Sequence, residues 1–423
     1  MRRRRAWTAA ILSLLLPVPA CHGDAGRDGA GVTLRMLVPA NERPFWLPLA
    51  ESFSRARPGV RLELDEGPVP TDLRESLTTS ALLSGDGAFD VVYLDVTWTP
   101  KLAAAGWLRP LDDDFGEAER AELLPQAVQA GFYRGRLYRL PFRTDVGLLY
   151  YRADLLAAAG VAPPRTFAQL EETARRLQSP PDRWGFLWQG AQYEGLVCVF
   201  LEVLHGHGGF WIEPASLRVG LDRPEAEAAL AFLVRARAPG GISPPGVAAY
   251  REEETRQLFQ GGRAVFLRSW PYVWRLARRE GSAVAGKIGV LPVPTLSGAP
   301  GAGTLGGWGL AVARSSRHPA EAVAFLRHAT RLESQRLFCA PTGFAPARLD
   351  AYSDPTLLAA NPFLAELLRI HAGATPRPAV ARYPQASDVL QRHLSAALAG
   401  LETTREALDA AARETRLVLG ADP

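Results

Sequence analysis

The sequence predicts an α/β fold in which two lobes enclose a cleft. Three observations support this expectation. Short β-branched runs alternate with helical patterns, the chain from Pro355 onward has no strand pattern, and two Pro- or Gly-containing stretches, residues 141–146 and 291–307, interrupt the alternation. Strands that alternate with helices are typical of mostly parallel sheets flanked by helices. A chain of 423 residues is long enough for two or three domain-sized units.

The expected strands are six apolar runs. They cover residues 32–38, 60–64, 89–94, 263–267, 287–291 and 309–313. Thr166 with Gln169 forms a capping box before a helix over 167–177. Glycines 160, 206 and 261 mark helix ends. Residues 357–370, 386–399 and 404–417 are expected to be helical, and the last of these helices is amphipathic.

The N-terminus has the three parts of a secretory signal. Residues 2–5 are arginines, residues 6–16 are apolar, and the segment ends in Val18-Pro-Ala20. Cys21 follows, as in a lipobox, where the thiol receives diacylglycerol; cleavage that leaves a free cysteine is the alternative. Residues 23–31 have the composition of a tether. The apolar run is shorter than the ~20 residues that span a bilayer, so we expect export with a lipid anchor.

Composition argues against several classes of partner. The formal net charge is +4, and removing the four arginines at positions 2–5 with the signal leaves zero. A neutral protein is not expected to bind nucleic acid or an anionic membrane as its main partner. Cys198 and Cys339 lie outside any Cys-x-x-Cys or Cys/His spacing, so neither a zinc site nor another cofactor is expected. Whether the two cysteines pair stays open.

Polar and aromatic residues cluster at positions that are expected in loops. Residues 188–196 alone contain an indole, two amides, a phenol and a carboxylate. Carboxylates and guanidinium groups bind sugar hydroxyls through charge-assisted hydrogen bonds, and aromatic rings cover the apolar faces of a sugar. A buried tryptophan next to a helix cap explains the same run equally well.

Similar chemistry recurs in five further clusters, which favours a binding site over five separate structural roles. They are Asp95 with Trp98, Asp145, Trp270-Pro-Tyr272, Leu305-Gly306-Gly307-Trp308, and Arg377 between two prolines. Paired glycines let backbone N–H groups approach a ligand closely.

These clusters resemble the trehalose/maltose-binding proteins, the extracytoplasmic substrate-binding subunits of ATP-driven sugar importers. The resemblance covers about residues 32–419. It rests on Asn41-Glu42, Tyr150-Tyr-Arg152, Trp188–Leu196, Trp270-Pro-Tyr272, Leu305–Trp308, Pro376-Arg-Pro378 and Tyr383-Pro-Gln385. It implies a two-lobed periplasmic-binding-protein fold that closes on an α-linked glucose disaccharide and then docks, as a monomer, on an ABC-type membrane permease.

The resemblance also implies roles for single residues. Those expected to bind sugar hydroxyls are Glu42, Asp95, Asp145 and Arg377, with Arg74 as a weaker match. Those expected to stack on sugar rings are Trp270, Tyr272 and Trp308, while Gly306 and Gly307 offer backbone contacts. One departure is Arg143, which stands where relatives can carry an aromatic residue; its extra guanidinium donors would favour a different sugar.

The expected organisation follows the two crossings. Residues 1–20 form the signal peptide and 21–31 the tether. The first lobe is expected to hold residues 32–142 and 296–345, and the second lobe residues 143–295 and 346–423. Hinge bending is expected near Asp145 and within 296–303.

Other functions remain as alternatives. A glycoside hydrolase could use Asp95 and Asp145 as its carboxylate pair, although Arg143 and Arg377 would hold both acids ionised. A structural or adhesion lipoprotein would not need so many polar and aromatic loop residues. A binding protein for another sugar, such as sucrose or glucosylglycerol, also remains open.

Some patterns are discounted. Gly301–Gly306 fits a dinucleotide fingerprint but precedes no helix. His205-Gly-His207 lacks a third metal ligand. Asp112–Asp114 and Glu252–Glu254 are interpreted as solvated faces or helix starts.

Overall fold

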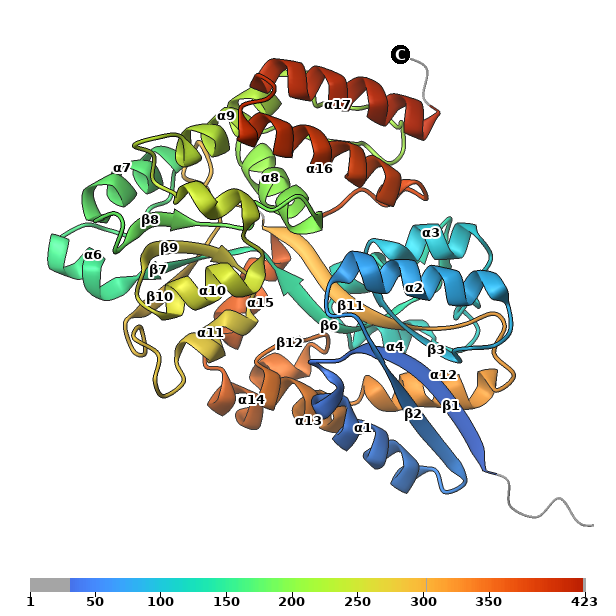
Figure 1. Ribbon diagram of the computed structural model, residues 1–423. Helices are drawn as coiled ribbons and strands as arrows, with labels where there is room; N and C mark the ends of the chain where they lie inside the picture. Colours follow the sequence, from blue (N-terminus) through green and yellow to red (C-terminus); the bar gives the residue numbers. More distant parts are fainter. Residues whose placement is uncertain (1–30, 302, 421–423) are drawn as a thin grey trace, which may run out of the picture.

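Two β-sheets form the framework of the protein, whose computed structural model describes residues 31–301 and 303–420 (Figure 1). The larger, seven-stranded sheet holds β1 (Val32–Pro39), β2 (Val60–Gly67), β3 (Val91–Asp95), β6 (Leu140–Val146), β11 (Thr304–Val312), β12 (Ala345–Pro346) and β13 (Thr375–Pro376). The smaller sheet holds β7 (Leu148–Arg152), β8 (Trp184–Leu187), β9 (Ala264–Ser269) and β10 (Ile288–Pro292), and a hairpin joins β4 (Phe132–Tyr133) to β5 (Arg136–Leu137). The predicted signal peptide, Cys21 and nearly all of the predicted tether lie outside the described residues.

The sheets are mixed, so the expectation of mostly parallel sheets is wrong. In the larger sheet the order is β12-β6-β11-β3-β1-β2, with β13 beside β11. β1 pairs in parallel with β2 and β3, but β11 runs antiparallel to both β3 and β6. In the smaller sheet β7 is antiparallel to β9 and β10. The antiparallel strands adjoin the points where the chain passes between the sheets, and an alternating sequence pattern cannot show that passage.

All six expected strands exist, and three longer strands were missed. β6, β7 and β8 lie where the sequence suggested a crossing or gave no strand signal. The missed strand β6 is buried at every position and carries Arg143 and Asp145. A strand that is buried on both faces shows no alternation of apolar and polar residues, and its charged residues hide it further.

Helices cover the larger sheet on both faces. They are α1 (Arg43–Ala56), α2 (Thr71–Ser84), α3 (Trp98–Ala104), α4 (Glu117–Ala121), α5 (Pro125–Gln129), α12 (Pro319–Ala329), α13 (Leu332–Thr342), α14 (Pro355–Ala360) and α15 (Leu364–Ala372), with the short η2 (Asp350–Ser353). α2 and α3 lie opposite α1 and α12 (Figure 1). Right-handed crossovers explain this, because β1 leads outward to β2 and β2 then leads back to β3.

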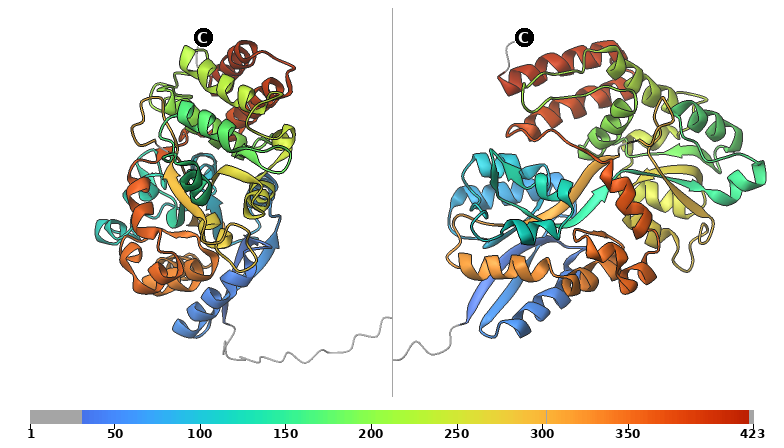
Figure 2. Two further views of the ribbon diagram at one scale, coloured as in Figure 1. Left: turned by 90° about the vertical axis from the view of Figure 1, so that its left-hand side faces the viewer. Right: turned by 180° about the vertical axis from the view of Figure 1, so that it is seen from behind.

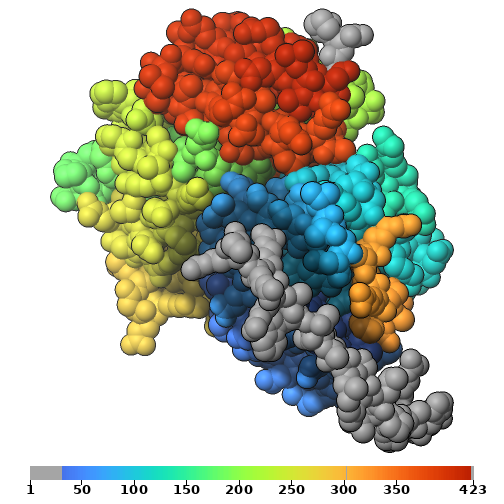
Figure 3. Space-filling model, turned by 45° about the vertical axis from the view of Figure 1, so that its right-hand side comes forward, coloured from blue at the N-terminus to red at the C-terminus, as the bar shows by residue number. Residues whose placement is uncertain are grey.

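The remaining helices surround the smaller sheet. They are α6 (Ala153–Ala159), α7 (Phe167–Leu177), α8 (Glu194–Gly206), α9 (Pro224–Arg237), α10 (Glu252–Gln260), α11 (Tyr272–Ala277), α16 (Tyr383–Ala399) and α17 (Thr404–Leu419), with the short η1 (Pro245–Ala249). α16 and α17 pack on α8 and α9 (Figure 2). In Figure 3 their red surface lies across the top of the molecule, above the yellow-green segment that contains α10 and the blue N-terminal segment.

Several helix ends follow from local sequence. The capping box at Thr166 is confirmed, because its side chain accepts from the Gln169 backbone at 3.1 Å. α6 ends at Gly160, whose φ is 66°. The single helix expected over 357–370 is wrong; Asn361 separates α14 from α15. Pro362 explains the break, because a proline disfavours helical backbone at the preceding residue.

The chain passes between the sheets twice at adjacent points. Gly147 separates β6 from β7, and β11 begins at Thr304, whose carbonyl accepts a hydrogen bond from Gly147 N at 3.2 Å. A side chain at Gly147 would place its Cβ 1.7 Å from Glu202 Oε1, so a glycine is required there. Within the described ranges, none of the helices combines the length and apolar character that crossing a bilayer requires.

Candidate functional site

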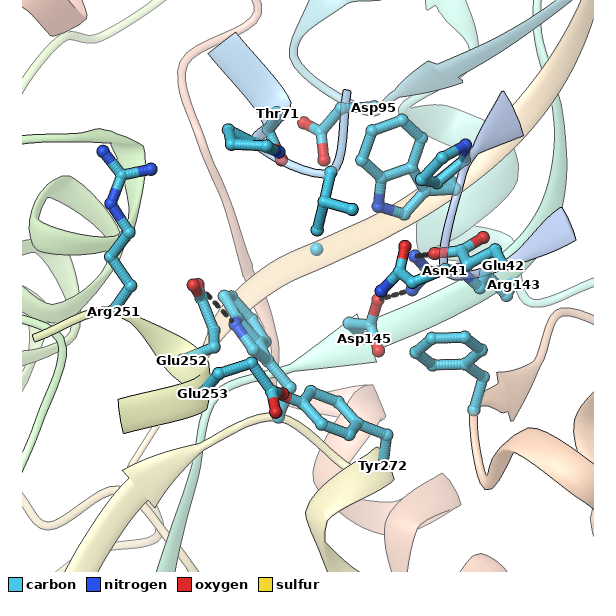
Figure 4. A pocket seen from close by; sticks show the side chains of 18 of the residues that line it. Asn41, Glu42, Thr71, Asp95, Arg143, Asp145, Arg251, Glu252, Glu253 and Tyr272 are labelled. Atoms are coloured by element: carbon cyan, nitrogen blue, oxygen red, sulfur yellow. Dashed lines mark hydrogen bonds and ion pairs between the residues drawn. The ribbon is translucent and has the colours of Figure 1, made fainter. Parts of the chain in front are cut away.

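A cavity of about 570 Å³ lies between the two sheets, within the size range of small-molecule sites. All ten residues predicted as ligand-binding line it: Glu42, Arg74, Asp95, Asp145, Trp270, Tyr272, Gly306, Gly307, Trp308 and Arg377. The larger sheet contributes the ends of β1, β3 and β6 and the middle of β11, while α8, α10 and α11 line the opposite wall (Figure 4).

Arg143 is the centre of one charged cluster. Its Nε donates to Tyr93 Oη at 2.8 Å, Nη1 to Asp145 Oδ2 at 2.7 Å, and Nη2 to Glu42 Oε1 at 3.1 Å. Tyr93 in turn donates to Glu42 Oε2 at 3.0 Å. Because side chains two apart on a strand share a face, β6 presents Arg143 and Asp145 together, and β3 and the start of α1 supply the other two.

Burial sets the charge state of this cluster. It raises the pKa of Asp145 to about 6, against the lowering effect of Arg143. For Arg143, burial alone would lower the pKa. The interactions with Tyr93, Glu42 and Asp145 outweigh burial, so the pKa of Arg143 lies above its ordinary value. At pH 7, about one unit above the pKa of Asp145, the guanidinium is charged and Asp145 is mostly ionised, so Asp145 presents hydrogen-bond acceptors to the cavity.

Arg377 is the centre of a second cluster, which joins the two sides of the cavity. Its Nη2 donates to Asp95 Oδ1 at 3.0 Å and its Nη1 to Glu194 Oε1 at 2.7 Å. Asp95 ends β3, and its Oδ1 also accepts from the Thr97 amide and hydroxyl. Glu194 begins α8 and accepts from Tyr383 Oη at 2.5 Å. Arg377 therefore connects the C-terminal end of β3 in the larger sheet to α8, a helix that packs on the smaller sheet.

The three predicted stacking residues differ in what covers them. Trp270 is half-buried, with the guanidinium of Arg268 4.1 Å from its ring centroid. Its Nε1 faces Glu252 Oε1 at 3.5 Å, and Tyr272 Oη donates to Glu253 Oε1 at 3.3 Å. Trp308 is only 7% exposed. It packs against Tyr93 and Trp98, and Arg74 covers its ring at 4.4 Å.

Gly306 and Gly307 allow β11 to lie close against β6. A Cβ at Gly307 would stand 2.7 Å from the backbone oxygen of Arg143, and the φ of +131° disfavours any other residue. A Cβ at Gly306 would meet Asp145 Cβ at 3.1 Å and the Trp270 ring at 3.3 Å. The glycines thus have a packing reason, in addition to the ligand contact predicted for them.

Some lining residues escaped the sequence reasoning. Glu252, Glu253 and Glu254 begin α10, as predicted for a helix start, but they also line the cavity. The run Trp188–Leu196 divides: Glu194 lines the cavity with its two neighbours, whereas Trp188 is fully buried and donates to Ser243 Oγ at 3.0 Å. An acidic helix start has the same sequence pattern whether it faces water or a cavity.

A metal site was not predicted, and the described residues include no group of three or more His, Cys, Asp or Glu side chains arranged to hold a metal ion. The open question about Cys198 and Cys339 is answered, because both are buried free cysteines. Burial raises the pKa of both thiols far above the ordinary value, which keeps them protonated and unreactive.

The arrangement is that of a binding protein with a two-sheet, mixed α/β architecture. Over residues 39–336 the chain matches the family model described as bacterial extracellular solute-binding protein. It therefore belongs to this family, whose members bind solutes and are not enzymes, so the hydrolase alternative is not supported. The fold is the periplasmic-binding-protein fold predicted from the resemblance.

Similar proteins include transporter subunits. A probable ABC transporter-binding protein of Deinococcus radiodurans is 35% identical over 339 residues, 78% of this chain and 80% of its own. A mannitol-binding protein of Pseudomonas aeruginosa is 28% identical over 87% of this chain and 88% of its own. Among solved structures, maltose-bound T. maritima MalE3 has 37% identity and a TM-score of 0.86, covering 92% of this chain and all of its own.

Proposed function

We propose that this protein captures a neutral saccharide of the trehalose or maltose type outside the cytoplasm and delivers it to an ABC permease. One observation carries the proposal: the two carboxylate–guanidinium clusters and the half-buried Trp270 line one cavity. Charged acceptors and donors match sugar hydroxyls, and the indole matches the apolar face of a pyranose. The resemblance to MalE3, which binds maltose, agrees with this ligand.

Charge supports a neutral ligand. Seven acidic and five basic side chains line the cavity, and each central arginine already pairs with two carboxylates. An anionic ligand would meet a net negative wall. Hydroxyl groups can donate to carboxylates and accept from guanidinium groups, so a polyhydroxylated neutral molecule uses both kinds of partner.

Capture would proceed by closure of two lobes about the crossings. The proposed lobes follow the two sheets: residues 32–146 with 304–376, and residues 148–292 with 383–419. These bounds differ from those expected from the sequence, 32–142 with 296–345 and 143–295 with 346–423, because β6, β13, α14 and α15 lie at the larger sheet. Contacts that exist only in the closed state must drive this motion. Arg377, which pairs with Asp95 and Glu194, is suited to hold the closed state. We further propose that Cys21 carries the lipid anchor and that the protein acts as a monomer.

Titration calorimetry with trehalose, maltose, sucrose, glucosylglycerol and mannitol tests the proposal. We expect one of the α-glucosides to bind with micromolar affinity, about −8 kcal/mol, and to remain intact after incubation. At 100 times its dissociation constant it stabilises the protein by about 2.7 kcal/mol, which a melting curve records. The Trp270→Ala variant is expected to lose at least tenfold in affinity. Binding of mannitol alone, or of no saccharide, contradicts the proposal.

A further inference from the structure

Aromatic rings on the two sides of the cavity are not equally available to a ligand. On the larger-sheet side, Arg143 lies with its guanidinium carbon 3.9 Å from the ring centroid of Phe344 and 5.6 Å from that of Trp308. Arg74 covers Trp308 at 4.4 Å. The other face of Phe344 packs on Phe338, with ring centroids 6.0 Å apart and nearly parallel. Guanidinium groups therefore occupy positions that a sugar ring would take against these two rings.

Trp270, on the opposite wall, keeps a face for a ligand. Arg268 lies over its ring at 4.1 Å, and the two groups are two residues apart at the end of β9. Among the described residues no other aromatic ring or guanidinium group stacks on this indole. Its half-buried position in the cavity lining allows a pyranose to pack on the remaining face.

The larger-sheet side instead offers hydrogen-bond acceptors. Asp145 is 6% exposed, and its Oδ1 has no partner among the described residues. The Thr97 amide, the Thr97 hydroxyl and Arg377 all donate to Asp95 Oδ1. None of the described groups donates to the other oxygen, Oδ2. Glu42 differs, since Arg143 and Tyr93 use both of its oxygens. Two carboxylate oxygens beside the covered rings thus lack a donor among the described residues. The Asp145 oxygen is fully buried, so a ligand hydroxyl reaches it only after a neighbouring side chain moves.

We infer that Arg143 is a specificity-determining residue that makes the site asymmetric. One pyranose stacks on Trp270, and the second unit of the ligand is held through its hydroxyls by Asp95 and Asp145, without stacking. The second unit therefore need not be a ring, and the ligand class is an α-glucoside of either a sugar or an open-chain polyol. This inference rests on the proposed function and names the substrate class of the same site.

Paired titrations of the purified exported protein test the inference. Each pair joins a disaccharide to an open-chain analogue: maltose with maltitol, and trehalose with α-glucosylglycerol. We expect at least one analogue to bind within about threefold of its disaccharide. In the Arg143→Phe variant, which replaces the guanidinium with a ring, the affinity for the disaccharide is expected to rise at least tenfold relative to the affinity for the analogue. Arg143→Lys keeps the positive charge but not the planar group over Phe344, so we expect its ratio to lie between those of the wild type and Arg143→Phe.

The ratio of the two dissociation constants is measured within one variant, so a partly destabilised variant still reports specificity. Phe45 of α1 also lines the cavity and carries no guanidinium among the described residues, so a Phe45→Ala variant that changes the ratio would show stacking on the larger-sheet side and overturn the inference. Phe210→Ala, at a ring that Arg218 covers outside the cavity lining, is the control, and we expect an unchanged ratio there. Rejection of both analogues while a disaccharide binds overturns this inference alone, as does an unchanged ratio in Arg143→Phe. If no disaccharide binds, the proposed function fails and the inference fails with it.

Discussion

Arg143 and Arg377 show how single residues define this site. Each buried guanidinium pairs with two carboxylates. One of the two acids belongs to the larger sheet in each case: Asp145 in β6 and Asp95 at the end of β3. Each guanidinium binds its two acids through different nitrogens of one rigid plane, a fixed geometry that lysine does not reproduce. The carboxylates are therefore oriented before a ligand arrives, which reduces the ordering that binding requires.

Removal of the Arg377 side chain should affect both binding and stability. Arg377→Ala leaves Asp95 and Glu194 without their shared partner in a buried place, and breaking a buried pair costs about 3–5 kcal/mol. We expect urea denaturation to show a loss of this order and calorimetry to show at least hundredfold weaker saccharide binding. Arg369→Ala, which removes an exposed pair with Glu366, is the matched control. Wild-type affinity in Arg377→Ala contradicts the site assignment.

Binding should depend on pH through Asp145. Its folded pKa is raised by burial to about 6, and hydroxyls that donate to the carboxylate favour its ionised form. Affinity should therefore fall as the pH decreases through 6, by up to about tenfold at pH 5 for one such group. Calorimetry at pH 7.5, 6 and 5 measures the slope, and an equal slope in Asp145→Asn would reject Asp145 as its source.

The same titration has the opposite sign for stability. Between its ordinary pKa of 3.8 and the folded value of about 6, Asp145 binds more protons in the folded protein than in the unfolded chain. Its contribution to the free energy of unfolding therefore increases as the pH falls through this window and decreases as the pH rises. The difference between wild type and Asp145→Asn in urea denaturation at pH 7 and pH 5 isolates this contribution.

At the scale of elements, β11 places most of the site. It lies between β3 and β6, with Trp308 opposite Asp95 and Gly306 opposite Asp145. The register shifts between Trp308 and Gly309, which is how a bulge re-aims a side chain. One strand thus brings an acid from each neighbour and its own indole to a common wall.

Gly306 and Gly307 of β11 should respond differently to alanine. Gly307→Ala combines a positive φ with a backbone clash at 2.7 Å, so we expect more than about 1 kcal/mol of destabilisation. Gly306→Ala meets the Trp270 ring at 3.3 Å and should weaken binding more than folding. Gly85→Ala, with a φ of +66° and open space around the Cβ position, controls for backbone strain. Equal stability of Gly307→Ala and Gly85→Ala contradicts the steric argument.

At the scale of the whole molecule, the crossings and the cavity share a buried ion pair. Arg268 binds Glu202, with Nε to Oε2 at 2.7 Å, and Glu202 Oε1 accepts from Thr304 N at 3.2 Å. The same arginine lies over Trp270. The Trp270 ring, on which the ligand is proposed to stack, is therefore connected through the side chains of Arg268 and Glu202 to the backbone at the start of β11.

Loss of Glu202 should consequently weaken folding and binding together. Glu202→Ala leaves Arg268 charged and buried, with an expected cost of about 3–5 kcal/mol, and it frees the guanidinium that supports Trp270. Urea denaturation and calorimetry measure the two effects. Glu366→Ala, at an exposed pair, should change neither. A Glu202→Ala protein within 1 kcal/mol of wild type would show that the pair does not hold the crossings.

Closure of the lobes should be visible in solution. If contacts across the cavity drive closure, a saturating saccharide should decrease the radius of gyration in small-angle X-ray scattering. Arg377→Ala, which lacks the link between Asp95 and Glu194, should show a smaller decrease under saturating ligand. An unchanged radius of gyration in the wild-type protein contradicts a hinged mechanism.

Local order and residue types could be read from the chain alone. The six expected strands, the capping box at Thr166 and the amphipathic C-terminal helix follow from apolar periodicity and capping chemistry, which act within a few residues. Side-chain chemistry and the family resemblance predict ten ligand-binding residues, and the structure brings all of them to one cavity. That they contact a ligand remains a prediction.

Tertiary structure decided the rest, because contacts between distant segments leave no local signal. The buried strand β6, the antiparallel course of β11 and the acids at the start of α10 depend on which segments lie beside them. The covering of Trp308 by Arg74, and of Phe344 by Arg143, likewise requires residues from separate elements to meet. The sequence by itself determined which groups are present and which short segments they occupy, whereas packing alone determined which faces of those groups remain open to a ligand.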